Sequence, residues 1–241
     1  MKSPPRIDAV RALLSGAAMS VLLMCSANAH AGLIAYTDQA AFNLAIAGWS
    51  ATTTDFESEA GGTMYGVGSG PAGSGFTLAL SGPDAPAMTP TVGDLFWTTS
   101  GMHYLGLDNP DTAFEAGDEL TFTFTSGMHG FGLYVIGTQD IGAGDITLTT
   151  STGSVANAAV ANLSDGQGSY AFFLGLASDD ATTFSSITLH NLTLLDPRLL
   201  NIAIDDVTLS RQRDDNQVPE PGALLLCLTG LLIAARTRRQ G

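Results

Sequence analysis

Residues 120–136 read LTFTFTSGMHGFGLYVI, and this stretch decides the fold class. Threonine alternates with leucine and phenylalanine over residues 120–125, and a second run rich in apolar and aromatic residues follows over residues 131–136. A period of two residues is typical of a half-buried β-strand, and the serine and glycines between the two runs are typical of the gaps between strands. The stretch therefore predicts two β-strands.

The same pattern recurs along the central part of the chain. Short runs rich in threonine, isoleucine, phenylalanine and valine alternate with segments rich in glycine, aspartate, asparagine and serine. The further runs cover residues 76–80, 145–149, 170–174, 186–190 and 202–209. Many short strands with few helices favour an all-β fold, an antiparallel β-sandwich of the jelly-roll type.

One short helix is expected at the start of this domain. Thr37 is the expected N-cap of a helix over residues 38–47, and Gly48 is its expected stop. The glycine-rich stretch 61–75 lacks the preceding strand, following helix and lysine of a nucleotide-binding loop. We therefore expect a flexible surface loop there.

The N-terminus has the features of a secretory signal. Three basic residues within the first eleven precede an apolar run over residues 12–25, and the small-x-small sequence Ala-His-Ala ends at Ala31. This order predicts a signal peptide over residues 1–31, which signal peptidase removes. A lasting N-terminal membrane helix is disfavoured because the apolar run is short.

The C-terminal tail, residues 218–241, reads VPEPGALLLCLTGLLIAARTRRQG. It combines a Pro-Glu-Pro motif, an apolar run and an arginine cluster; the residues are Pro219, Glu220, Pro221, Arg236, Arg238 and Arg239. This tail resembles the PEP-CTERM sorting signal of Gram-negative bacterial surface proteins. The resemblance implies that an exosortase acts at the motif and that a C-terminal transmembrane helix holds the protein in the membrane before processing. A permanent tail anchor is the alternative.

These features divide the chain into four parts: the signal peptide, a β-sandwich ectodomain over residues 32–210, a polar linker over 211–218, and the sorting signal over 219–241. Export across the inner membrane to the cell surface or the extracellular space follows from this order.

Charge and cysteine content restrict the function of the central part. Residues 32–217 contain 21 acids and three bases, a net charge of −18, and no lysine. Such a surface repels nucleic acid and attracts cations. Both cysteines, Cys25 and Cys227, belong to the targeting segments, so the mature domain has no disulfide and no thiolate metal site.

Acidic residues near the two ends of the domain suggest a calcium site. Asp55-Phe56-Glu57 lies near the start, and Asp205 and Asp206 lie in the last predicted strand. The two segments resemble those of β-sandwich ectodomains of PEP-CTERM proteins and of jelly-roll carbohydrate-binding modules that hold a structural calcium. The resemblance implies a Ca²⁺ site formed by Glu57, Asp205 and Asp206.

Strand alternation refines this prediction, because it places Asp205 and Asp206 on opposite faces. We therefore expect Asp205 rather than Asp206 to share the site with Glu57. The alternative is that these acids only protect turns and edge strands from aggregation.

Catalysis is not expected. The histidines of the mature domain lack metal-ligand spacing, and no Gly-x-Ser-x-Gly motif occurs. The sequence favours a non-catalytic binding or scaffold protein of the extracellular polysaccharide matrix. The alternative is a lectin-like carbohydrate-binding module in which Trp97 and Tyr104, at either end of a short loop, form a sugar platform unless both pack in the core. A secreted glycan hydrolase is disfavoured.

Overall fold

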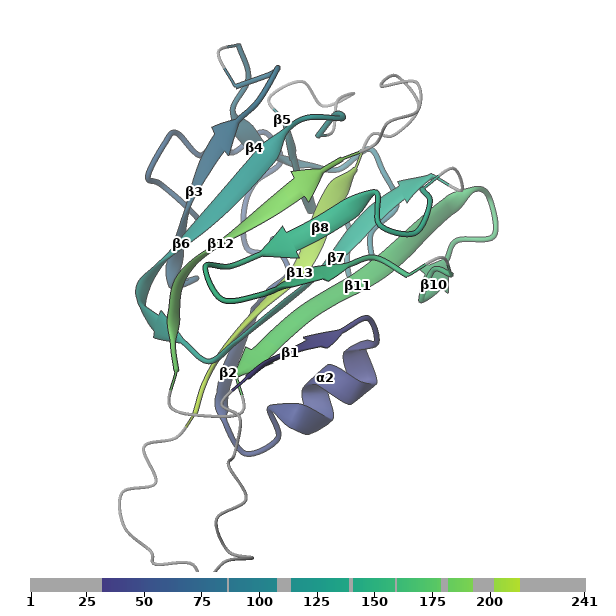
Figure 1. Ribbon diagram of the computed structural model, residues 1–241. Coiled ribbons are helices and arrows are strands. Elements are labelled where there is room, and N and C mark those ends of the chain that lie inside the picture. The colour runs from purple at the N-terminus through teal and green to yellow at the C-terminus, as the bar shows by residue number, and fades with distance from the viewer. Residues whose placement is uncertain are drawn as a thin grey trace, which may run out of the picture. The chain divides into compact units, whose positions relative to one another are not determined.

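Two antiparallel sheets stack on each other in the computed structural model, and one short helix lies beside them (Figure 1). The structure describes residues 32–212 except for 86, 108–113, 139–140, 159, 179–181 and 193–201. The predicted signal peptide and the predicted sorting signal lie outside the described residues. No helix within the described ranges is long and apolar enough to cross a membrane.

The larger sheet has the strand order β1-β11-β7-β13-β5-β4, with β10 paired to β11 and β2 paired to β13. Its strands are β1 (Leu33–Tyr36), β2 (Ser50–Thr54), β4 (Pro90–Gly93), β5 (Tyr104–Leu107), β7 (Gly130–Thr138), β10 (Leu163–Ser164), β11 (Ser169–Ser178) and β13 (Ala203–Arg211). The smaller sheet has the order β3-β6-β12-β8-β9. Its strands are β3 (Phe76–Ser81), β6 (Glu119–Met128), β8 (Ile146–Thr149), β9 (Ser154–Ala156) and β12 (Phe184–Asn191).

The all-β sandwich predicted from the sequence is confirmed, and every predicted strand is present. β6 and β7 are the two strands of the stretch at 120–136, and they lie in different sheets. Six short strands were not predicted, namely β1, β2, β4, β5, β9 and β10. β13 continues to Arg211, one residue past the expected end of the domain.

Two local expectations need correction. The helix α2 covers Gln39–Ala45, and its N-cap is Asp38 rather than Thr37, because the Asp38 carboxylate accepts a hydrogen bond from the Ala41 amide at 2.8 Å. The glycine-rich segment 61–75 is not a free loop, because backbone hydrogen bonds join it to two strands. The amides of Tyr65 and Leu78 donate across these contacts, each at 2.8 Å.

The main core lies between the sheets, where aromatic side chains from both sheets meet. The ring of Phe131 on β7 packs against Phe122 and Phe124 on β6, with centroids 5.1 and 5.6 Å apart. Aromatic pairs at this separation add to the stability that burial of the rings provides. This core holds the two sheets together.

A second apolar cluster covers the outer face of the larger sheet, under α2. Gly132 on β7 pairs directly with Gly175 on β11, and the ring of Phe42 lies over this glycine pair. A Cβ atom at Gly132 would lie 3.0 Å from Phe42, and one at Gly175 would lie 2.9 Å from it. The two glycines therefore leave the space that lets the helix approach the sheet.

We expect Phe42→Ala to lower the free energy of unfolding by about 3–4 kcal/mol, because Phe42 is fully buried and its loss leaves a cavity. Gly132→Val should also destabilise the protein, because its side chain would meet the ring. Urea denaturation measures both effects.

The matched control is Leu44→Ala, since Leu44 lies on the same helix and is 77% exposed. Its effect should stay within about 0.5 kcal/mol. Equal effects at Phe42 and Leu44 would show that the helix does not depend on the buried ring.

Candidate functional site

The loop between β4 and β5, residues 94–103, brings the predicted site residues of the domain together. We call it the aromatic loop. Trp97 belongs to it, Tyr104 directly follows it, and the carboxylates of Glu57, Asp205 and Asp206 bind its backbone and side chains. Segments from the start, the middle and the end of the described chain therefore meet at one place.

Glu57 holds the end of the aromatic loop that leads into β5. One of its carboxylate oxygens accepts hydrogen bonds from the amides of Met102 and His103, each at 2.6 Å. These amide hydrogens, that of His103 first, lower the pKa of Glu57 below its usual value. A side chain at Gly101 would collide with the Glu57 carboxylate, so this position requires glycine.

The turn before Glu57 places its side chain. Phe56 is fully buried in the main core and has a φ of 61°, a left-handed conformation that is rare for a residue with a Cβ. The Asp55 carboxylate accepts a hydrogen bond from the Glu57 amide at 3.1 Å and closes the turn. Burial of the Phe56 ring thus fixes the position from which Glu57 reaches the loop.

Asp205 and Asp206 hold the middle of the aromatic loop. Asp205 Oδ2 accepts hydrogen bonds from the Thr99 amide at 2.8 Å, the Thr99 hydroxyl at 2.7 Å and the Ser100 amide at 3.1 Å. Asp206 accepts from the Ser100 hydroxyl at 2.7 Å and lies 2.8 Å from the Thr99 hydroxyl. Both carboxylates therefore reach the same two loop residues.

The expectation that Asp205 and Asp206 point to opposite faces is wrong. Asp206 has a φ of 51°, and the pairing of β13 with β7 shifts its register between Asp205 and Thr208. Such a β-bulge interrupts the alternation of side chains along a strand. The bulge turns both carboxylates toward Thr99 and Ser100.

The buried carboxylate of Asp205 lies beside that of Asp206. The pKa of Asp205 is raised to about 6, mainly by burial and also by the nearby Asp206, while the hydrogen bonds from Thr99 and Ser100 lower it. The Thr99 hydroxyl has a single hydrogen, yet it lies within 2.8 Å of an oxygen of each carboxylate. Asp205 therefore favours a proton or a nearby cation.

The three predicted calcium ligands do not form one cluster. Glu57 binds residues 102–103, whereas the aspartates bind residues 99–100. Within the described ranges, no group of three His, Cys, Asp or Glu residues is placed to hold a metal ion. Calcium takes six to eight oxygen ligands, so Asp205 and Asp206 fit it only as two ligands of a larger set. Calcium stays a prediction, now for the aspartate pair alone.

The predicted sugar platform also changes. Tyr104 is only 1% exposed, because its ring packs in the outer cluster against Gly93, so it has no free face to offer. Phe96, which the sequence did not single out, stacks on Tyr104 with centroids 5.4 Å apart and is 39% exposed. Trp97 is half-buried against the same cluster, and Met102 is 67% exposed. Phe96 and Trp97 are therefore the aromatic rings that the loop presents.

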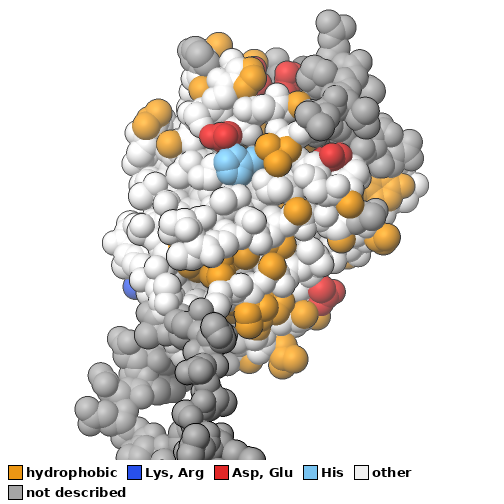
Figure 2. Space-filling model, viewed as in Figure 1, with side chains coloured by type: hydrophobic (Ala, Val, Ile, Leu, Met, Phe, Trp, Pro, Cys, Tyr) orange, Lys and Arg blue, Asp and Glu red, His pale blue; other side chains and the backbone are white. Residues whose placement is uncertain are grey.

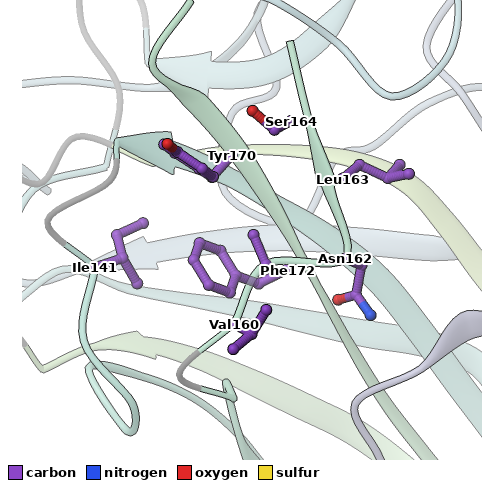
Figure 3. Close-up of a pocket in the computed structure, with 8 residues that line it drawn as sticks. Ile141, Val160, Asn162, Leu163, Ser164, Tyr170 and Phe172 are labelled. Atoms are coloured by element: carbon purple, nitrogen blue, oxygen red, sulfur yellow. The ribbon is translucent and has the colours of Figure 1, made fainter. Parts of the chain in front are cut away.

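A separate hollow of about 390 Å³ opens beside β10 and the start of β11 (Figure 3). Phe172, Ile141 and Val160 form its apolar part, and Tyr170 and Ser164 lie at its other side (Figure 3). It contains none of the predicted site residues.

Comparison with known proteins gives little further information. No family model and no curated protein matches the chain. The cleaved K2 adhesin domain of Lys-gingipain is 12% identical, with a TM-score of 0.39, 67% of this chain covered and 100% of that domain. A mutant of the family 29 carbohydrate-binding module CBM29-2 is also 12% identical, with a TM-score of 0.30, 71% of this chain covered and 99% of that module. At this level of similarity neither structure informs the function.

For the aspartate pair, we expect EDTA to lower the melting temperature of the purified chain at pH 7.5, because removal of a cation leaves two adjacent charges uncompensated. Asp206→Asn should remove this sensitivity, because it removes one charge of the pair. Differential scanning calorimetry with and without EDTA measures both effects.

Glu57→Gln is the control, because Glu57 binds another part of the loop. It should keep the sensitivity to EDTA while speeding the hydrogen exchange of the Met102 and His103 amides. An unchanged melting curve of the unmodified chain in EDTA rejects the calcium site.

Proposed function

We propose that this chain is an exported, surface-sorted and non-catalytic binding or scaffold protein of the extracellular polysaccharide matrix, and that the aromatic loop is its binding element. One observation carries this proposal. The aromatic loop is tied to the sandwich by three carboxylates, yet it leaves Phe96 and part of Trp97 open to solvent. A loop held in one conformation loses little entropy when it binds, which favours affinity.

The chemistry of the loop suits sugars. The faces of pyranose rings stack on aromatic side chains, which contribute a large contact area. Phe96 packs against the buried ring of Tyr104, and this contact orients the Phe96 ring. This arrangement also supports the alternative of a lectin-like carbohydrate-binding module, which differs from the scaffold in requiring one specific sugar.

The use of the carboxylates supports binding over hydrolysis. Glycosidases need two carboxyl groups that face the substrate. Glu57 and Asp205 instead accept hydrogen bonds from the loop, and Asp205 is fully buried. A secreted glycan hydrolase therefore remains the disfavoured alternative.

Export and sorting are proposed from the two ends of the chain. The signal peptide would be cut by signal peptidase, and the tail over residues 219–241 would insert in the membrane until an exosortase acts at Pro219-Glu220-Pro221. The net charge of −18 over residues 32–217 argues against nucleic acid as a partner. A tail that stays in the membrane is the alternative.

We expect Phe96→Ala and Trp97→Ala each to weaken binding to the polysaccharides of a glycan array at least tenfold, because each removes a stacking face. Val160→Ala is the matched control, since Val160 is exposed but lies outside the aromatic loop. The melting temperature of each variant shows whether the fold is intact. Binding that both aromatic variants retain rejects the loop as the site, and turnover of a polysaccharide would favour the hydrolase.

For sorting, we expect Glu220→Ala to keep its tail in a host that makes an exosortase, whereas the unmodified chain loses it. Mass spectrometry of the exported protein measures the difference. Gln217→Ala, just before the motif, is the control and should be processed normally. A tail retained by the unmodified chain would show a permanent anchor.

A further inference from the structure

A second cleft, of about 230 Å³, lies where β2 pairs with the end of β13. Arg211 pairs with Ser50, and Leu209 pairs with Thr52. Every second residue of a strand points to the same face, so these four side chains share one face, and all of them line the cleft. We call it the Arg211 cleft. Arg211 lies six residues beyond Asp205 on β13, which places the cleft roughly 20 Å along the strand from the aromatic loop.

The charge of the Arg211 cleft differs from that of its surroundings. Of the described residues, Arg211 is the only lysine or arginine, and no carboxylate among them forms an ion pair with it. Figure 2 shows the contrast on one face of the molecule, where acidic side chains are scattered and basic ones form a single small spot at the lower left. A guanidinium without a carboxylate partner among the described residues attracts an anion from solution.

The other residues of the cleft define the shape of that anion. Ser50 and Thr52 supply exposed hydroxyl groups beside the guanidinium, and Met128 and Leu209 form a buried apolar floor. Arginine binds a carboxylate through two parallel hydrogen bonds, and hydroxyls bind further oxygens. A ring that bears one carboxylate and several hydroxyl groups matches all three features.

We propose that the Arg211 cleft binds the carboxylate of a uronic acid residue in an acidic polysaccharide. That the carboxylate belongs to a polysaccharide rests on the proposed function, whereas the preference for a carboxylate is inferred from the residues of the cleft. The acidic domain repels a densely charged polyanion, so the cleft fits a polysaccharide whose uronic acid residues are separated by neutral sugars.

The test uses the purified full chain and two monosaccharides that differ only in the carboxylate, galacturonate and galactose. We expect galacturonate to bind at least tenfold more tightly than galactose and to shift the NMR signals of residues 50–52 and 211. Arg211→Gln should weaken galacturonate binding at least tenfold and leave galactose unchanged. Arg211→Lys should recover only part of the affinity, because it keeps the charge but loses the paired hydrogen bonds.

Three outcomes would overturn the proposal. One is equal binding of the two sugars, and another is unchanged galacturonate binding in Arg211→Gln. The third is that galacturonate binds only when Asp214 and Asp215 are both replaced by asparagine. This result would show that these two aspartates of the same chain occupy the cleft in the unmodified protein.

A failure here is distinguishable from a failure of the proposed function. Phe96→Ala tests the aromatic loop and should leave galacturonate binding at the Arg211 cleft unchanged. Polysaccharide binding that depends on Phe96, without galacturonate binding, rejects only the cleft. The opposite result rejects only the aromatic loop.

Discussion

Hydrogen bonds from one loop to three carboxylates set the geometry on which the candidate site depends. Asp205 and Asp206 lie on β13, which pairs with β7, β5 and β2 in the larger sheet, and Glu57 follows a turn anchored by the buried Phe56. Because the anchors belong to the sandwich, the aromatic loop inherits its rigidity. Side chains that would be mobile on a free loop are presented in one arrangement.

The two faces of the larger sheet contribute differently to this arrangement. The inner face packs against the smaller sheet through Phe131 and its neighbours, and the core between the sheets contains most of the buried apolar residues. The outer face carries a separate cluster that includes Phe42 over the glycine pair and Tyr104 beneath Phe96. The aromatic loop therefore rests on the outer cluster, while its anchoring carboxylates come from β13 and from the turn at Phe56. The outer cluster thus both stabilises the protein and supports the aromatic loop.

The sequence predicted the sandwich because half-buried strands show a two-residue period, as at 120–125. It missed β2, whose Ser-Ala-Thr-Thr-Thr is mostly exposed, and β5, whose residues are all buried, because neither shows that alternation. It predicted that Glu57, Asp205 and Asp206 form one calcium site, whereas they bind two separate parts of the aromatic loop. The bulge at Asp206 arises where β13 pairs with β7, and the hydrogen bonds from Thr99 and Ser100 join segments that are distant in the sequence. No local sequence pattern predicts either feature.

The anchors of the aromatic loop also order events during synthesis. Glu57 leaves the ribosome before the loop, but Asp205 and Asp206 follow it by about a hundred residues, as the spacing of Thr99 and Asp205 shows. A chain that stops before residue 205 lacks Asp205 and Asp206, so it cannot form their hydrogen bonds with Thr99 and Ser100. The aromatic loop therefore reaches its described arrangement only after β13 has joined the larger sheet.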